Sequence, residues 1–598
     1  MNPIRTLPAL CLLMIFGAAP AGAVSPDAPP GLPNGIAAGD LTQDTAVLWA
    51  RSSTPGVVRF ELALLPWFLS PLWQEEVTVD DPAVPAKVRV EGLDPGQRYF
   101  YRVRSPQGGS LIGSFRTPAS DGGAADLRFG VSGDWRGELA PYPAIANAIG
   151  RRLEFFVELG DTIYADYPSP AVPADQASTL AELRAKHGEV YAERFGVASW
   201  AALRRQVPVY AVIDDHEVTN DFAGGAPAAT DTRFAETSGL INETALYGNG
   251  LQAFHEYNPI DEAVYPTVGD DRTDGRPDLY RFRSFGDLAA LFLLDARSFR
   301  DTELAEVADP LSPLEVSNFV ARSFDIDPAT LADLPPRTML GERQLDRLKA
   351  DLLDAQSRGI TWKFVMVPEP IQNLSVVLAP DRFEGYARER SEILRFIDEH
   401  GIANVVFVSA DIHGTLINNL TYRRREDVAA ALAAQGDALA APVIPIPAFE
   451  ITTGSVAFDA PFGPTVLSLL ETVPGGDELL AQLLGVLGLA SLDQFFDLPP
   501  LVKNLVTQLV ANQLLADYGY DPLGLRAAPG VDARKLWGLY TAAFSYGWTE
   551  FSIDRRSRDL RVITYGIEPY TRLELEADPS AVTARSPRIL SLFRVRPQ

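Results

Sequence analysis

Cysteine is almost absent from this sequence. Its 598 residues include only one, Cys11, which lies in an apolar N-terminal segment. Disulfide bonds therefore contribute nothing to the stability of the rest of the chain, and a bound metal would be held by oxygen and imidazole ligands. Carboxylates are abundant, and they are the ligands that hard cations prefer.

Positive charge is also in short supply. The chain has 52 Lys and Arg against 78 Asp and Glu, a formal net charge of -26 and a pI near 4.7. This balance makes general binding to nucleic acid or to an anionic membrane unfavourable. It does not exclude an anionic substrate, because metals and a few local arginines can overcome a screened long-range repulsion.

Long apolar runs are missing after the N-terminus. Residues 1–23 contain Arg5, an apolar run from Leu7 to about Ala19, and the small residues Ala21-Gly22-Ala23, which is the pattern of a secretory signal peptide. The run is shorter than the ~20 residues of a spanning helix, and no later segment matches it. We therefore expect an exported protein, periplasmic or secreted, without a transmembrane anchor.

The remaining chain has the composition of a large globular protein, 46% hydrophobic with mean hydropathy near zero, and its length suggests two to four domains. Residues 34–118 carry short runs separated by turn residues, which predicts a small β-sandwich. Leu93-Asp94-Pro95-Gly96 before Tyr99 resembles the tyrosine corner of fibronectin-III-like sandwiches. No acids or histidines converge there, so we expect a supporting or partner-binding role.

A linker-like PASDGG at residues 118–123 precedes a different pattern, in which buried strands alternate with helical stretches. This predicts an α/β domain over residues 124–575. The expected strands include Leu127 to Ser132, Leu153 to Leu159, Val209 to Ile213, Leu288 to Leu294, Lys363 to Val367 and Val405 to Ser409, and a closing hairpin pairs Trp548 to Ile553 with Leu560 to Tyr565.

A leucine-rich stretch at residues 464–518 interrupts this domain. Leu501, Leu505 and Leu509 follow at helical spacing after Pro499-Pro500. We predict a helical insertion at about residues 464–530, packed on its own domain. A lid, a subunit contact or a lipid-facing patch through residues 464–518 are the alternatives.

The most informative stretch is LEFFVELGDTIYAD, residues 153–166. A short buried strand ends at Gly160, where the backbone can turn sharply. Asp161, Tyr164 and Asp166 then emerge at the carboxyl end of the strand, where open α/β sheets bind ligands, and offer oxygens to a metal. A strand followed by an ordinary polar loop is the alternative interpretation of this stretch alone.

Five strand ends repeat this arrangement. The ligand-type residues that follow predicted strands are Asp134; Asp161, Tyr164 and Asp166; Asp214, Asp215, His216 and Glu217; Asp295 and Arg297; and Asp411 and His413. Five such ends indicate a sheet with a metal site at its rim. Crowded carboxylates repel each other unless cations neutralise them, which also favours bound metal.

At these residues the chain resembles the metallophosphoesterases, and within them the PhoD-like alkaline phosphatases. The segments that carry the resemblance run from SGDWRG at residue 132 to SADIHG at residue 414, and include GDTIYAD, VPVYAVIDDHEVTNDF, LLDARSFRD, LGERQLDRL and FEGYARERSEIL. GIAAGDLTQDTAVLWAR also looks like the N-terminal domain of that family. The resemblance implies a four-layer sandwich of two mixed sheets flanked by helices, after an N-terminal fibronectin-III-like β-sandwich.

The resemblance also implies a metal-ligand set. Asp161 would bridge two metals, and Tyr164 would bind the more acidic one, an Fe3+. Asp134 stands where many PhoD-like members carry a cysteine. Asp215 would bind the second ion, and Asp411 and His413 would complete the ligand set. An oxygen-dominated second site suits Ca2+ or another hard divalent ion better than zinc.

His216 is our candidate general acid, because it neighbours a proposed ligand and its ordinary pKa allows proton donation near neutral pH. A structural or metal-ligating histidine is the alternative. Arg297, Arg136 and Asn220 are candidates for holding phosphate oxygens, and a surface or structural salt-bridge role is the alternative for each of them.

Together these observations predict an exported phosphoesterase that cleaves monoesters, diesters or both by in-line attack of water activated at two metals. No activated serine or cysteine motif points to a covalent intermediate. Phospholipase-type diester hydrolysis is the alternative enzyme. A non-enzymatic exported protein that holds only structural calcium is the alternative outside catalysis.

Overall fold

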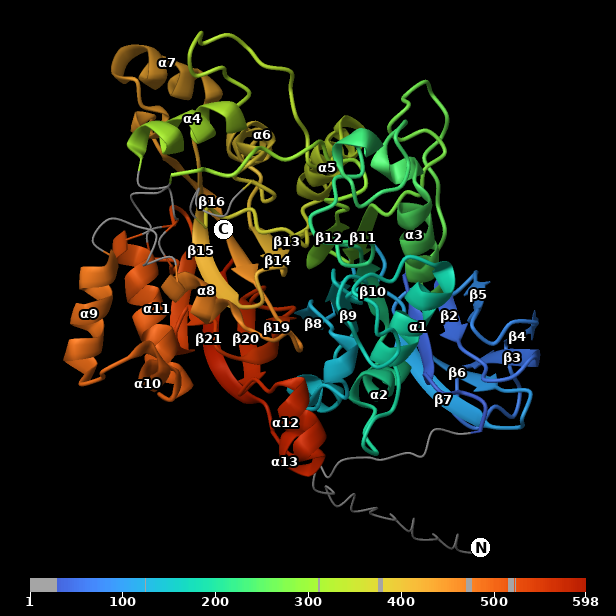
Figure 1. The fold of residues 1–598 in the computed structure, drawn as a ribbon. Coiled ribbons are helices and arrows are strands. Elements are labelled where there is room, and N and C mark those ends of the chain that lie inside the picture. The colour runs from blue at the N-terminus through green and yellow to red at the C-terminus, as the bar shows by residue number, and fades with distance from the viewer. Residues whose placement is uncertain are drawn as a thin grey trace, which may run out of the picture.

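The structure is a computed structural model, and it describes residues 30–123, 125–309, 312–374, 380–468, 476–514, 521, 523–526 and 528–598. The expected signal peptide and Cys11 lie outside these residues. The described strands form three sheets, of ten, seven and four strands (Figure 1).

The ten-stranded sheet is mixed. Three of its neighbouring strands, β8, β9 and β10, run parallel, and β1 continues the parallel set beside β10. Antiparallel strands extend both sides. In sheet order the strands are β17 (Asp532–Gly538), β21 (Arg588–Arg596), β20 (Leu560–Ile567), β19 (Tyr546–Ile553), β8 (Leu127–Ser132), β9 (Phe155–Leu159), β10 (Val209–Val212), β1 (Ile36–Gly39), β2 (Ala46–Ala50) and β5 (Ala86–Val90).

The seven-stranded sheet has a parallel centre, β12, β13, β14 and β16. The strands in order are β11 (Arg281–Phe285), β12 (Ala289–Leu293), β13 (Trp362–Met366), β14 (Val405–Ser409), β16 (Ile444–Thr452), β15 (Thr415–Tyr422) and β18 (Thr541–Ala542). β12, β13 and β14 are buried along their whole length, as expected for apolar runs in a sheet covered on both faces.

The two large sheets pack face to face. Phe129 and Val157 of one sheet share a core with Phe364 and Val408 of the other. Helices α1 (Leu180–Val190), α2 (Ser199–Gln206) and α3 (Ala245–Tyr257) cover the outer face of the ten-stranded sheet. Helices α5 (Glu342–Ser357) and α6 (Ala387–Glu399) cover the outer face of the seven-stranded sheet. The layers therefore follow the expected order of helices, sheet, sheet and helices.

The other helices are shorter or lie at the periphery. They are α4 (Pro313–Ser323), α7 (Arg425–Gln435), α8 (Phe462–Ser468), α9 (Gly476–Leu487), α10 (Leu492–Phe496), α11 (Pro500–Leu514), α12 (Arg572–Ala577) and α13 (Pro579–Thr583). Short 3-10 turns occur at η1 (Gly137–Leu139), η2 (Pro143–Ile145), η3 (Ala148–Arg151), η4 (Ala228–Thr230), η5 (Ile241–Glu243) and η6 (Ala438–Ala440).

The N-terminal strands do not form a self-contained unit. β3 (Gly56–Ala63), β4 (Trp73–Val79), β6 (Arg98–Arg104) and β7 (Ser110–Arg116) make the four-stranded sheet, whereas β1, β2 and β5 belong to the ten-stranded sheet. The Tyr99 hydroxyl accepts a hydrogen bond from the Asp94 amide at 2.8 Å, which is a tyrosine corner. A boundary at residue 118 therefore cuts through a continuous sheet.

Strand pairing also continues past the expected C-terminal boundary of the α/β domain. The α/β domain was expected to end at residue 575, yet β21 lies beyond it and pairs with both β17 and β20. The sequence pattern missed β21 because its alternating arginines resemble an exposed strand outside a core. Strand pairing, which is a tertiary property, brings it into the sheet.

The leucine-rich stretch is helical where the structure describes it, in α8 to α11. Phe462, Val466, Val506 and Val510 pack with Phe544 in a cluster of their own. The insertion is joined to the rest of the molecule at Phe462, whose amide donates to the His413 carbonyl at 3.1 Å. Across the described residues, we find no helix with the length and apolarity needed to cross a membrane.

Candidate metal centre

The ends of the central strands of both large sheets meet at one place. Asp134, Asp161 and Asp215 follow β8, β9 and β10, which are parallel neighbours and so finish at the same edge. His413 follows β14 of the other sheet. Backbone hydrogen bonds hold the loops together, since the Trp135 amide donates to the Asp161 carbonyl at 2.9 Å.

The ligand-type residues at these ends share an uncommon backbone conformation. The φ angles are 65° at Asp134, 51° at Asp161, 62° at Asp411 and 57° at His413, all in the left-handed region. Asp and His enter this region more readily than most residues, and strain of this kind gathers at functional sites. Gly160 makes the predicted turn with a φ of 80°.

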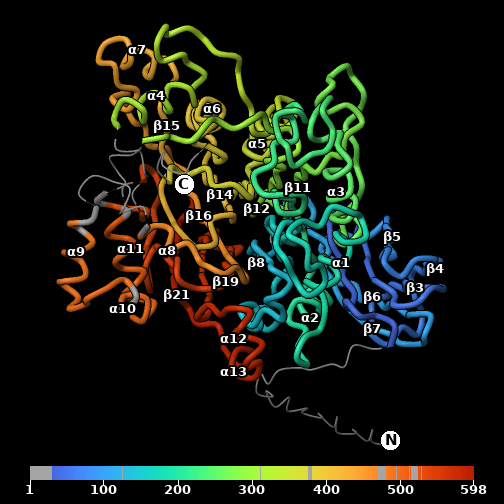
Figure 2. Tube along the Cα trace, viewed as in Figure 1, coloured from blue at the N-terminus to red at the C-terminus, as the bar shows by residue number. Residues whose placement is uncertain are grey.

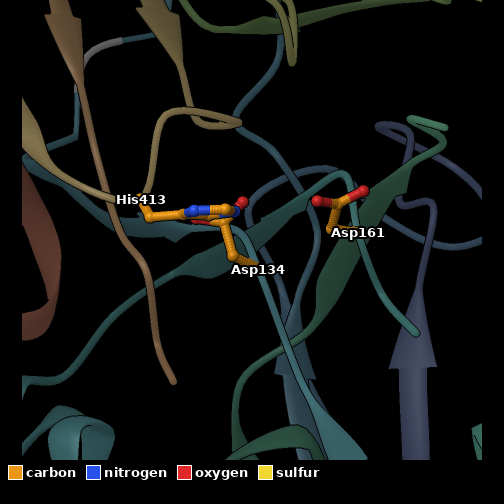
Figure 3. Close-up of side chains that lie close together, drawn as sticks. All are labelled: Asp134, Asp161 and His413. Atoms are coloured by element: carbon orange, nitrogen blue, oxygen red, sulfur yellow. The ribbon is translucent and has the colours of Figure 1, made fainter. Parts of the chain in front are cut away.

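One group of ligand atoms comes from Asp134, Asp161 and His413, which lie within 4.8 Å of one another (Figure 3). The Tyr164 hydroxyl joins them, at 2.7 Å from Asp161 Oδ2 and 3.2 Å from His413 Nε2. Both carboxylate oxygens of Asp134 are buried and have no hydrogen-bond partner among the described residues. Buried acceptors without a donor are the kind of group that a bound cation would satisfy.

A second group comes from Asp161, Asp215 and His216, whose ligand atoms also lie within 4.8 Å of one another. Asp161 belongs to both groups. The His216 amide donates to Asp215 Oδ1 at 3.0 Å, which fixes the loop after β10. The structure thus brings together six of the residues that the sequence singled out, namely Asp134, Asp161, Tyr164, Asp215, His216 and His413.

The electrostatics of the first group favour a cation. Burial raises the pKa of Asp134 and Asp161 well above the usual value, and at Asp161 the charge of Asp215 adds to the effect. Burial and the repulsion of Asp161 also raise the pKa of Tyr164, and burial lowers that of His413 to about 3. Buried oxygen donors and a neutral imidazole therefore form a donor set that fits a metal ion.

Asp215 and His216 behave differently. Burial alone would raise the pKa of Asp215, but Arg297 and His216 offset it and lower the pKa below the usual value. Burial would lower the pKa of His216, but Asp215 and Asp166 offset it and raise the pKa to about 9. These shifts favour a carboxylate at Asp215 beside a protonated imidazole at His216.

Asp166 orients His216. Its Oδ1 lies 2.6 Å from His216 Nδ1, and its Oδ2 accepts the Asn220 amide at 2.8 Å. Both oxygens are therefore in use, and Asp166 is not a member of either ligand group. The Asn220 side chain is exposed and donates to Asp221.

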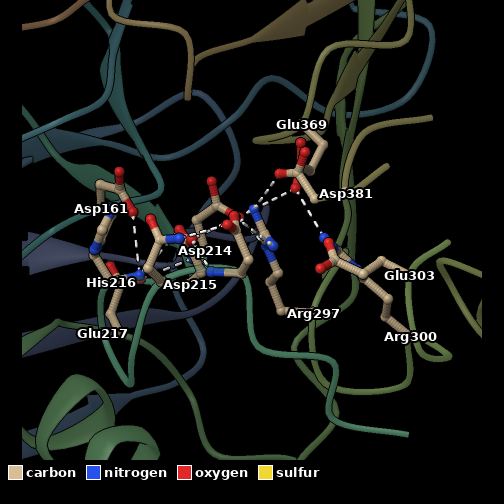
Figure 4. A network of polar contacts seen from close by, with 12 residues as sticks. Asp161, Asp214, Asp215, His216, Glu217, Arg297, Arg300, Glu303, Glu369 and Asp381 are labelled. Atoms are coloured by element: carbon tan, nitrogen blue, oxygen red, sulfur yellow. Dashed lines mark hydrogen bonds and ion pairs between the residues drawn. The ribbon is translucent and has the colours of Figure 1, made fainter. Parts of the chain in front are cut away.

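Arg297 occupies a different place from the one expected for a phosphate-binding residue. Its side chain is fully buried, with Nε 2.7 Å from Asp214 Oδ1 and Nη2 paired with Glu369 (Figure 4). Arg300 Nη1 also reaches Glu369 Oε1, at 3.0 Å. This placement argues against direct phosphate contact, because the guanidinium is already committed to carboxylates, and makes Arg297 a positioning residue for the acidic rim.

Asp411 lies among carboxylates outside the two ligand groups. Burial raises its pKa well above the usual value, and Glu369, Asp214 and Asp381 add to the rise. It belongs to neither ligand group among the described residues. Asp295 shapes a turn, since its Oδ1 accepts the amides of Arg297 and Ser298 at 3.0 and 2.9 Å.

An aromatic wall borders the first group. Phe458 stacks on the His413 ring with 3.6 Å between centroids, and the Arg136 guanidinium lies 5.3 Å from Phe458 and 4.6 Å from Tyr167. Arg136 is also paired with Glu138. Of the candidate phosphate ligands it is the one beside the ligand group that is still partly exposed, at 16% of its side chain.

Three residues that contribute to the site, Glu369, Glu217 and Phe458, were given no role by the sequence patterns. Glu369 follows β13, so the strand-end signal was available for it. Glu217 accepts from the Thr162 hydroxyl at 2.6 Å and the Asp214 amide at 2.9 Å, which ties two strand-end loops together. No sequence signal indicates Phe458, because its loop reaches the site only in the folded chain.

Comparisons with known proteins agree with this geometry. Residues 131–463 match the sequence profile of the PhoD-like phosphatases, and residues 17–119 match that of their N-terminal domain. Alkaline phosphatase D of Bacillus subtilis (strain 168) is 25% identical over 418 residues, which is 64% of this chain. The match spans 65% of that relative's length.

Solved structures extend the likeness of fold. A structure of PhoD superposes with a TM-score of 0.63 at 18% identity, covering 95% of this chain and 92% of that one. A purple acid phosphatase of yellow lupin (Lupinus luteus) reaches a TM-score of 0.43 at 9% identity, covering 90% of this chain and 72% of its own. Only the first score is high enough to support the fold.

Proposed function

Because the chain belongs to the PhoD-like phosphatase family, we propose that it hydrolyses phosphate esters at a two-cation centre in which Asp161 is the shared ligand. The observation that carries this proposal is the membership of Asp161 in both ligand groups. Asp134, Tyr164 and His413 would hold one cation with Asp161. Asp215 would hold the other with Asp161; Asp411, which the family resemblance adds to the ligand set, lies outside both groups of the described residues.

Bound cations would lower the pKa of a water molecule and neutralise phosphoryl oxygens. The residues of the chain supply the remaining functions. His216, held by Asp166 at 2.6 Å, donates a proton to the leaving oxygen. Arg297 keeps Asp214 and Glu369 in place behind the rim. Arg136, beside Phe458, has a partly exposed side chain, whereas Arg297 is buried. Its guanidinium would bind phosphate oxygens.

The identity of the cations and the export of the protein are further parts of the proposal. A Tyr164 phenolate and an aspartate-rich set suit Fe3+ at the first position, and oxygen ligands suit Ca2+ at the second. Asp134 supplies a carboxylate where many family members carry a cysteine. The elemental analysis described below should therefore cover other divalent ions as well as iron and calcium. Export rests on the signal-like pattern of residues 1–23.

The test is Asp161→Asn, which keeps the shape of the side chain but removes a ligand charge. We expect loss of both cations by elemental analysis and loss of turnover on a panel of mono- and diesters, by more than about a hundredfold, since metal activation of water is removed. Asp94→Asn, an exposed change remote from the site, is the matched control.

The same preparations separate the alternatives. A visible charge-transfer band that disappears in Tyr164→Phe supports iron, whereas colourless active protein excludes iron and leaves the hydrolase intact. Cations without esterase activity in the unchanged protein indicate a calcium-binding protein instead. If Asp161→Asn keeps both cations and near-normal turnover, the centre is misassigned.

A further inference from the structure

A second surface of the molecule, outside the metal centre, carries a group of exposed apolar side chains. We call it the α11–β17 face and define it by the exposed apolar side chains of three elements. These are Leu501 (64% exposed), Leu505 (45%) and Leu509 (43%) of α11, Leu536 (47%) and Trp537 (63%) of β17, and Ile589 (40%) of β21. β17 ends the ten-stranded sheet, and so no strand that the structure describes lies beside its outer edge.

Helix α11 is apolar on two sides. Its inner side places Val506 and Val510 in the core of the insertion, 6% and 1% exposed. Leu501, Leu505 and Leu509 recur every four residues on the outer side, where the described residues do not cover them. A helix with one apolar stripe is typical of a protein surface, and a second stripe requires a second apolar environment.

A groove of about 410 Å³ runs between α11 and the sheet edge. Leu501 lies on one side, and Trp537 and Ile589 lie on the other, with Leu539 and Leu590 also in the lining. Asn504 is at the groove as well, but its Oδ1 accepts the Ala543 amide at 2.8 Å. The lining therefore offers mainly apolar contact.

The charges around this face have the opposite sign to the whole molecule. β17 and β21 together carry five basic residues, Arg534, Lys535, Arg588, Arg594 and Arg596, and one acid, Asp532. α11 adds Lys503 and no acid of its own, and Glu568 and Asp497 lie near that lysine. Asp532 is paired with Arg596, whereas Arg534, Lys535 and Arg588 form no ion pair with any residue that the structure describes. The whole chain, in contrast, has a formal charge of -26.

From this combination we propose that the α11–β17 face docks on an anionic phospholipid bilayer. Leucines and a tryptophan enter the interfacial region, and the unpaired cations meet lipid phosphates, as in other surface-bound amphipathic elements. The overall negative charge opposes general membrane binding. It therefore favours an orientation in which the locally basic strands β17 and β21 meet an anionic surface.

The charges also disfavour a second copy as the occupant. A two-fold interface would bring the same patch of both subunits together and so place cations against cations. Lys and Arg on an edge strand further oppose pairing with the edge of another molecule. This inference is independent of the proposed hydrolysis, since none of its residues belongs to the metal centre.

Another apolar surface provides a matched comparison. The loop between β3 and β4 exposes Leu65 (55%), Trp67 (62%) and Leu69 (89%). Its two strands carry one base and three acids, Arg59, Glu61, Glu75 and Glu76, and thus lack the charge of the first face. In Figure 2 the two surfaces lie at opposite sides of the molecule, so one flat bilayer would not engage both.

Tryptophan fluorescence gives a direct test. The protein has eight tryptophans, of which Trp49, Trp135, Trp200, Trp362 and Trp548 are at most 1% exposed, and Trp67 and Trp537 are the most exposed. With vesicles of phosphatidylcholine and phosphatidylglycerol that contain brominated acyl chains, we expect quenching. Trp537→Phe should remove the quenching while the protein still co-sediments, and Trp67→Phe should leave it unchanged.

Charge variants complete the test. Arg534→Gln with Lys535→Gln should weaken co-sedimentation by about thirtyfold, from roughly fivefold per basic residue near an anionic surface, and 0.5 M salt should have a similar effect. Phosphatidylcholine vesicles alone should bind far less. Absence of co-sedimentation, quenching that depends on Trp67, binding that leaves Trp537 unquenched, or a dimer broken by Trp537→Ala would each overturn the proposal.

Discussion

At the scale of single residues, the centre depends on where side chains are aimed more than on which side chains are present. Asp161 and Asp166 are both aspartates on one loop, yet Asp161 lies in both ligand groups and Asp166 holds the His216 ring. Tyr164 points back to Asp161 and His413. The same carboxyl group thus acts as a ligand or as an orienting acceptor according to its backbone conformation.

The orienting role predicts the outcome of Asp166→Asn. Loss of the carboxylate removes the charge that holds and protonates His216, so we expect kcat to fall by about ten- to a hundredfold for alkyl phosphates, whose leaving groups need a proton. Activated aryl phosphates should lose much less, and metal content should stay unchanged. Equal losses for both substrate classes would contradict the assignment of His216 as the acid.

At the scale of elements, the strand-end loops interlock. The segment after β16 crosses to the other sheet, where the Val456 and Ala457 amides donate to the carbonyls of Gly133 and Asp134 at 3.0 and 3.2 Å. Gly454 lies in this segment with a φ of 113°. A Cβ atom at Gly454 would be 2.6 Å from Asp134 Oδ2.

Gly454→Ala should therefore displace the Asp134 carboxylate and add backbone strain. We expect loss of the cation that Asp134 holds and a drop in turnover of at least about tenfold, together with a stability cost of about 1–3 kcal/mol. Gly92→Ala is the matched control, because Gly92 also has a positive φ, 71°, but a Cβ there would meet nothing within 4 Å. If both variants are only destabilised and both keep their metal, the close approach of Gly454 to Asp134 does not matter for function.

At the scale of the whole molecule, each of the two large sheets contributes residues to the metal centre, and the two sheets share an apolar core. Asp134, Asp161 and Asp215 come from the ten-stranded sheet, and Asp411 and His413 from the seven-stranded one. Burial raises the pKa values of Asp161 and Asp411, and repulsion from neighbouring carboxylates adds to the rise. A cation held by Asp161 and His413 would link the two sheets.

Chelation should accordingly lower the thermal midpoint of the protein. A cation at about 100 times its Kd stabilises the folded state by about 2.7 kcal/mol, so we expect a shift of several degrees in differential scanning calorimetry on addition of EDTA. Asp161→Asn, which lacks the shared ligand, should show little or no shift. An equal shift in the variant would point to cations bound elsewhere.

The sequence determined the local features of this protein. Short apolar runs, each followed closely by an aspartate, predicted β8, β9, β10 and β14, since a buried run of this length is typical of a strand whose backbone is paired in a sheet. The same pattern indicated Asp134, Asp161, Asp215 and His413 before any geometry was known. The leucine spacing likewise predicted α11.

Tertiary structure decided what local patterns do not encode. Strand pairing placed β1, β2 and β5 in the same sheet as β8 to β10, and it recruited β21 beyond the expected boundary. Packing buried Arg297 between Asp214 and Glu369 and brought Phe458 onto His413. Such contacts join residues distant in the chain, and their free energy depends on the distance and burial that only the folded molecule sets.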